Sequence, residues 1–116
     1  MDVGYGQAEI SAPAGTIMDG RRSAGGTTGL HDPLFVRALW LRHEGAQVAV
    51  AALDLLHAER DLADRLKGAA GRALDLRASE LLLNFSHTHA APCFCRWAYG
   101  GPPDPAYVEK VEGALV

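Results

Sequence analysis

A strand, an amphipathic helix and a second strand follow one another in the middle of the chain, and this order restricts the fold more than any other feature. Residues 47–54 form an apolar run that ends in Asp54. Over residues 58–74 the apolar positions recur with the period of a helix, and residues 81–85 form a second apolar run. This order predicts a right-handed βαβ unit with two parallel strands. Because parallel strands end at the same edge of a sheet, Asp54 and the segment after Phe85 should lie on one edge, where such sheets place their sites.

Two further strands are predicted before this unit. Residues 35–42 are mostly apolar on both alternating faces, which is typical of an inner strand, and residues 43–46 predict a hairpin turn into residues 47–54. Residues 5–11 alternate weakly and predict a short first strand. We therefore expect an α/β fold, a mixed β-sheet in which a β-hairpin precedes a right-handed βαβ unit. A helical pattern over residues 107–116 lacks a closing signal, so we expect a partial domain that continues in a longer chain.

The composition is that of a soluble globular protein and argues against two classes of partner. Apolar residues make up 48% of the chain and charged residues 22%, with a net charge of −3 and no basic run, so nucleic acid is not a favoured partner. The longest apolar stretch, residues 47–56, contains Asp54 and is far shorter than the ~20 residues of a transmembrane helix. No signal peptide is evident at the N-terminus, which leaves both a cytoplasmic and an exported location open. The oligomeric state is not predicted.

A long loop over residues 16–32 is rich in glycine, serine and threonine. Loops of this length are usually functional or disordered. The phosphate-binding pattern G-x-x-x-x-G-K-[ST] is absent from it. Arg21 and Arg22 could meet an anionic group there, although solvated side chains are the more ordinary interpretation. The three isolated histidines have no mutual spacing that suggests a site, and we interpret them as surface or turn residues: His31, His43 and His57.

The motif His87-Thr88-His89 is the strongest local signal for chemistry. If the strand continues through residue 89, the two imidazoles share a face and converge on one ion or one substrate. Imidazole nitrogen suits zinc, at roughly 2.0–2.1 Å. The alternative is a pair of hydrophilic loop histidines. The carboxylate of Asp54 could receive a histidine N–H and orient that ring, or it could be a helix cap or turn residue.

Cys93 and Cys95 offer a rival zinc site together with His87 and His89. The two cysteines are too near in sequence for a mutual disulfide. Structural zinc sites usually draw their ligands from two separated clusters, and four ligands within so short a segment, with Pro92 in the middle, would struggle to surround one ion. Small, partly buried side chains are the simpler interpretation of both cysteines.

Four blocks of sequence, taken in order, resemble the neutral/alkaline (non-lysosomal) ceramidase family over about residues 3–112. They are G-x-G-x-A-E-I-S-A-P-A-G at residues 4–15, GLHDPLFVRA at 29–38, AALDLL at 51–56 and SHTHAAP at 86–92. The last block departs from the family pattern, because Ala90-Ala91-Pro92 stands where Ser-Gly-Pro is usual. The resemblance implies that residues 1–116 are the N-terminal part of a zinc-dependent catalytic domain that hydrolyses a lipid amide, N-acylsphingosine, to a sphingoid base and a fatty acid.

The resemblance also implies roles for the two histidines. His87 is the expected zinc ligand, and His89 lies beside the ion, faces the substrate and is the expected catalytic residue. A further histidine, a glutamate and a tyrosine would complete the zinc site from downstream sequence, so we expect the chain to be inactive by itself. Zinc would activate water for attack on the amide carbonyl, and His89 would donate a hydrogen bond to the oxyanion or the attacking oxygen.

Two alternatives remain at this point. The chain could be a small non-enzymatic α/β binding module in which His87 and His89 are surface residues. It could also belong to a different metal-dependent hydrolase that uses H-x-H, such as the amidohydrolase type. That type carries the motif on the first strand of a barrel, whereas at least three strands are expected before His87 here.

Overall fold

A tight turn at Glu44 and Gly45 joins the two central strands of the sheet. Both residues have positive φ, 49° and 81°. A two-residue turn of this kind matches the twist of the strands that it connects. Strand β2 (Phe35–His43) therefore pairs antiparallel with strand β3 (Ala46–Leu53), and the predicted hairpin is confirmed.

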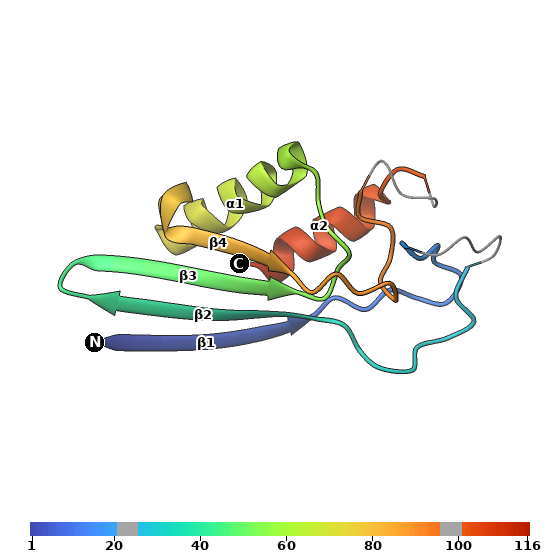
Figure 1. Cartoon of the computed structure of the whole chain (residues 1–116), viewed down its shortest axis with the longest axis horizontal. Helices are drawn as coiled ribbons and strands as arrows, with labels where there is room; N and C mark the ends of the chain where they lie inside the picture. Colours follow the sequence, from blue (N-terminus) through green and yellow to red (C-terminus); the bar gives the residue numbers. More distant parts are fainter. Residues whose placement is uncertain (21–25, 96–100) are drawn as a thin grey trace.

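The computed structural model describes residues 1–20, 26–95 and 101–116 (Figure 1).

The outer strands complete a mixed sheet in the order β1-β2-β3-β4. Strand β1 (Asp2–Glu9) is antiparallel to β2, and strand β4 (Leu81–Phe85) is parallel to β3. Helix α1 (Arg60–Leu74) and the short 3₁₀ helix η1 (Ala78–Glu80) connect β3 to β4. The α/β fold with a strand, helix and parallel strand is as predicted. The first strand begins and ends earlier along the chain than residues 5–11 suggested.

One face of the sheet packs against two helices, α1 and α2 (Pro105–Ala114). Leu66 of α1 and Val111 of α2 are both 0% exposed and join one hydrophobic core with Leu53 of the sheet. Both helices lie on the same side of the strands (Figure 1). The hydroxyl of Tyr107 in α2 donates a hydrogen bond of 2.7 Å to the carbonyl of Ile10, which attaches the helix to the segment after β1. Among the described residues, no helix is both long and apolar enough to cross a bilayer.

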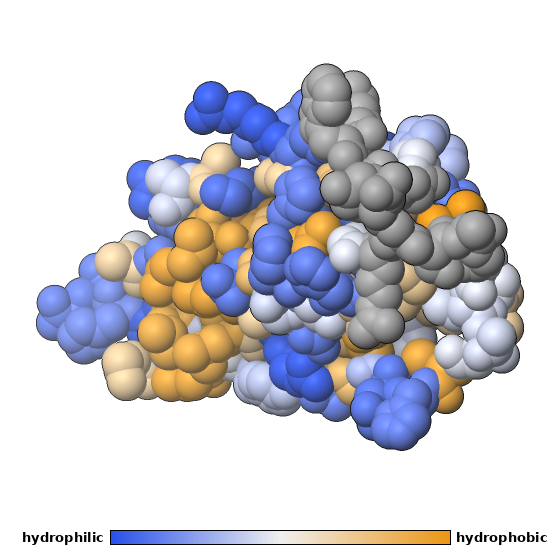
Figure 2. Space-filling view, turned by 45° about the vertical axis from the view of Figure 1, so that its right-hand side comes forward, coloured by the Kyte–Doolittle hydropathy of each residue, from blue (hydrophilic) through white to orange (hydrophobic). Residues whose placement is uncertain are grey.

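The opposite face of the sheet is exposed and carries many apolar side chains. Tyr5, Leu39, Val48 and Leu82 point to this face and are between 40% and 67% exposed. Strand β2 is an inner strand as predicted, but only one of its faces is buried, because both helices pack on the same side. No described element covers the other side. Hydrophobic side chains also gather in a contiguous patch on the part of the surface seen in Figure 2.

Candidate functional site

The carboxyl ends of β3 and β4 lie together at one edge of the sheet, as the parallel pairing requires. The chain segments beyond both ends stay side by side. The N–H of Ser86 donates to the carbonyl of Leu53 at 3.0 Å, and the N–H of His87 donates to the carbonyl of Leu55 at 3.1 Å. The motif at residues 87–89 therefore lies at the edge that the sequence pattern indicated.

His87 does not continue the strand, so the condition under which the two imidazoles would share a strand face is not met. The strand ends at Phe85, and His87 has a φ of 60°, in the left-handed region. A residue with a Cβ rarely adopts this conformation, and such residues cluster at functional sites. The turn still brings the two rings together, with the centroids of His87 and His89 5.3 Å apart and an interplanar angle of 64°.

Both imidazoles are held through the same ring nitrogen. Nδ1 of His87 lies 3.2 Å from the carbonyl oxygen of Leu56, and Nδ1 of His89 lies 3.1 Å from that of Gly20. A carbonyl oxygen only accepts, so Nδ1 carries the proton in each ring. In the neutral tautomer this leaves the lone pair on Nε2, the arrangement in which histidine binds a metal ion. Both side chains are exposed.

Gly20 allows the close approach of His89. Its φ is 70°, and a Cβ at this position would lie 2.7 Å from Cγ of the imidazole. A side chain at residue 20 would therefore be strained in the backbone and would also displace the ring. The sequence showed Gly20 only as one of several glycines in a long loop.

A cavity of about 430 Å³ opens beside His89. Apolar side chains from three segments contribute much of its lining, among them Met18, Leu30 and Pro92. His31 also lines it, and the hydrogen bond that its imidazole donates to the carboxylate of Asp32 raises the pKa of this histidine. The predicted glycine-rich loop thus contributes to the cavity. Arg21 and Arg22 of the same loop lie outside the described residues.

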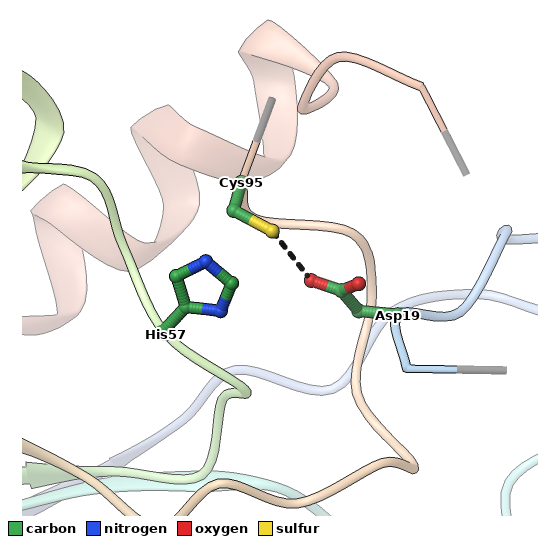
Figure 3. Close-up of side chains that lie close together, drawn as sticks. All are labelled: Asp19, His57 and Cys95. Atoms are coloured by element: carbon green, nitrogen blue, oxygen red, sulfur yellow. Dashed lines mark hydrogen bonds between the residues drawn. The ribbon is translucent and has the colours of Figure 1, made fainter. Parts of the chain in front are cut away.

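A second group of side chains lies under the same edge. Asp19, His57 and Cys95 come from three separate segments, after β1, after β3 and after β4, and converge on one another (Figure 3). A ligand atom from each lies within 4.8 Å of those of the other two. Asp19 and Cys95 are both 0% exposed, and His57 is half-buried. Aspartate oxygen, imidazole nitrogen and cysteine sulfur form a donor set that could hold a metal ion.

The thiol of Cys95 donates a hydrogen bond of 3.1 Å to Oδ2 of Asp19. Burial raises the pKa of Cys95 to about 12, and the hydrogen bond and negative charge of Asp19 add to the effect. The other carboxylate oxygen of Asp19 accepts the N–H of Gly20 at 2.8 Å. Cys95 is therefore a protonated, buried thiol in the metal-free protein.

Sequence reasoning missed this group. It interpreted His57 as a surface or turn residue and gave Asp19 no role, because no spacing along the chain connects them with Cys95. Among the described residues, the alternative cluster of His87, His89 and both cysteines is not formed. The backbone after the motif bridges back to the loop after β1, with Cys93 N–H donating to Ile17 O at 3.1 Å, which turns Cys95 toward Asp19.

Asp54 does not orient a histidine, which removes the first of the two roles left open for it. Its carboxylate accepts the N–H of Phe35 and the guanidinium of Arg37, each at 3.0 Å. The side chain thus connects the end of β3 to the start of β2. In the described part of the chain, backbone carbonyls orient His87 and His89 instead.

The fold has a close counterpart of known structure. The chain is similar to the neutral ceramidase of Pseudomonas aeruginosa, with a TM-score of 0.85 and 19% identity over 98% of this chain. The match covers 20% of the ceramidase chain, so the present chain corresponds to a small part of that protein. At this identity the similarity shows a shared fold. No protein-family model matches the sequence, and the search of curated proteins found no match.

Proposed function

We propose that the chain is part of the catalytic domain of a zinc-dependent amide hydrolase, in which His87 binds zinc and His89 moves a proton. The observation that carries the proposal is the shared anchoring of the two rings, whose Nδ1 atoms bond to the carbonyls of Leu56 and Gly20 and leave Nε2 available. Neutral imidazoles fixed in this way suit zinc. The similarity to a ceramidase supports the same function.

The proposed substrate is a ceramide-like lipid amide, an N-acylsphingosine that is cleaved to a sphingoid base and a fatty acid. The cavity beside His89 supports this choice, because Met18, Leu30 and Pro92 offer apolar surface to a hydrocarbon chain next to the reacting groups. An apolar lining with a few polar groups at one side is typical of small-molecule sites.

The tautomer of His89 determines its part in the reaction. Zinc supplies Lewis acidity toward the amide carbonyl when it is bound. Since Nδ1 of His89 donates to the carbonyl of Gly20, Nε2 is the one proton acceptor of the neutral ring. Nε2 takes a proton from the attacking water, and the imidazolium then donates that proton to the leaving nitrogen. The hydrogen bond to the oxyanion that the sequence suggested therefore requires a ring that has first been protonated.

The remaining zinc ligands are proposed to come from a longer chain, because the structural match covers 20% of the ceramidase. One imidazole ligand cannot form a catalytic zinc site, which takes at least three protein ligands. Residues 1–116 are therefore expected to be inactive by themselves.

The test is zinc-dependent hydrolysis by the protein in its full natural length. Release of fatty acid from an N-acylsphingosine should stop after chelation and return when zinc is added. A matched amide with a short acyl group should be cleaved with a higher KM, because it loses contact with the apolar cavity. Hydrolysis that survives complete zinc removal, or no hydrolysis of either amide by the zinc-loaded protein, would contradict the proposal.

A further inference from the structure

The buried group formed by Asp19, His57 and Cys95 carries an inference separate from the proposed catalytic zinc. We propose that these three side chains bind a zinc ion that joins the loops beneath the catalytic edge. This ion would be a second one, distinct from any ion held by His87. The inference does not depend on the proposed hydrolysis.

The geometry is near that of a zinc site. Metal–ligand bonds of 2.0–2.3 Å in a tetrahedral arrangement place the donor atoms roughly 3.3–3.6 Å apart. Sγ of Cys95 and Oδ2 of Asp19 are already 3.1 Å apart, and all three donors lie within 4.8 Å of one another. Any remaining gap lies at the half-buried His57 and is at most about 1.5 Å, whereas the two fully buried ligands can stay in place.

The charges balance when zinc binds. The ion replaces the thiol proton of Cys95, which leaves to solvent, and the S–H···O hydrogen bond gives way to one bond from sulfur and one from Asp19 to the metal. A thiolate, a carboxylate and a neutral imidazole neutralise two positive charges, so the buried site carries no net charge. In the described residues, no lysine or arginine forms an ion pair with Asp19. Sulfur and nitrogen donors favour zinc over calcium or magnesium.

A cysteine nucleophile is the competing interpretation of the same three residue types, and the structure disfavours it. In a catalytic triad the thiol bonds to histidine, whereas the thiol of Cys95 bonds to Asp19. Cys95 is 0% exposed, and none of the three residues lines the cavity beside His89.

The proposed ion would support the two motif histidines indirectly. The carbonyl that holds His87 belongs to Leu56, the residue before His57. The carbonyl that holds His89 belongs to Gly20, the residue after Asp19. An ion bound to Asp19 and His57 therefore fixes the backbone segments on which both imidazoles are anchored.

Cobalt binding to the purified, metal-free protein tests the inference. We expect one Co²⁺ per site with a thiolate-to-cobalt charge-transfer band and the visible bands of tetrahedral coordination. Zinc should displace the cobalt, and calcium and magnesium should not. Alkylation of Cys95 by iodoacetamide should be slow in the folded metal-free protein. Absence of the thiolate band, or rapid alkylation of Cys95, would overturn the proposal.

Matched variants identify the ligands. Cys95→Ser and His57→Gln should each remove the thiolate band or weaken the binding of cobalt. The loss of affinity should exceed the roughly 10–100-fold that follows when a residue that only supports a ligand is replaced. Cys93→Ser, two positions away, and His87→Ala should both retain the band. A band that is lost with Cys93 or with His87 would assign the metal elsewhere and refute this site. X-ray absorption of the wild-type protein, which counts sulfur and nitrogen ligands, decides the matter even if Cys95→Ser fails to fold.

Discussion

Two groups of side chains at the same edge of the sheet differ in almost every physical property. His87 and His89 are exposed, adjacent to a cavity and anchored to backbone carbonyls. Asp19 and Cys95 are fully buried and bond to each other. The two exposed histidines are accessible to a small molecule in the cavity. The buried group is not accessible from the cavity and is suited to holding the three loops together. The comparison also suggests that the buried group sets the position of the exposed one.

The largest expected effect follows from removing the proposed catalytic ligand. In the full-length protein, His87→Ala should lower kcat/KM by more than about 10³-fold, because the metal supplies several kcal/mol of charge stabilisation. Steady-state hydrolysis and metal analysis measure the loss. His43→Ala is the control, since His43 is an exposed histidine at the hairpin turn, at the other end of β2 and β3. Equal activity of the two variants would remove His87 from the reaction.

His89→Ala should lower kcat by about 10²–10⁴-fold with little change in bound zinc, because in the proposed mechanism the residue moves a proton and does not bind the metal. Stability should change by less than about 0.5 kcal/mol, since the side chain is exposed. If His89→Ala lost as much zinc as His87→Ala, His89 would be a zinc ligand as well, and the two rings would not have the different roles proposed.

Cys95→Ala should act on stability, in contrast to the exposed pair. It removes the S–H donor of a carboxylate that is 0% exposed, and an unsatisfied buried acceptor costs about 1–3 kcal/mol. Chemical denaturation of the metal-free protein measures the difference from wild type. If Cys95→Ala were as mild as His89→Ala in this assay, the buried group would have no structural role.

Gly20→Ala tests the link between the buried group and His89, and its effect should be the smallest of the four. Left-handed backbone costs a side chain about 1–2 kcal/mol, and the new Cβ would also meet His89. Gly15→Ala is the matched control, because Gly15 has a φ of 90° and nothing within 4 Å of its Cβ position. Both variants should lose stability through the left-handed backbone, Gly20→Ala the more because of its contact with His89, and Gly20→Ala alone should lower kcat. The same kcat in both would show that the contact with His89 is unimportant.

Much of the fold follows from local patterns. The period of apolar residues predicts the helix over 58–74, which spans Arg60–Leu74, and the strand over residues 81–85 is reproduced at Leu81–Phe85. The parallel pairing of β3 and β4 follows from their order with a helix between them. The sequence pattern of β2 could not show that one of its faces stays exposed, because this depends on the side of the sheet against which both helices pack.

The site was only partly predictable. The H-T-H motif and its location at the carboxyl edge follow from the sequence, whereas the left-handed turn at His87 does not. Of the two roles left open for Asp54, orienting a histidine is not observed, because the carboxylate bonds to Arg37 on the neighbouring strand. The predicted hairpin places these two strand ends side by side, but the sequence does not show which partner the carboxylate takes.

The sequence by itself determined the strands, the helices, the edge at which they place a site and the two histidines at that edge. Only the tertiary structure brought Asp19, His57 and Cys95 together and bound each motif histidine to a carbonyl. The physical reason is that the spacing of apolar residues, alternating in a strand or recurring with each turn of a helix, is a local signal. It shows which side of one element is buried. Contacts among three loops depend on how the whole sheet and both helices pack.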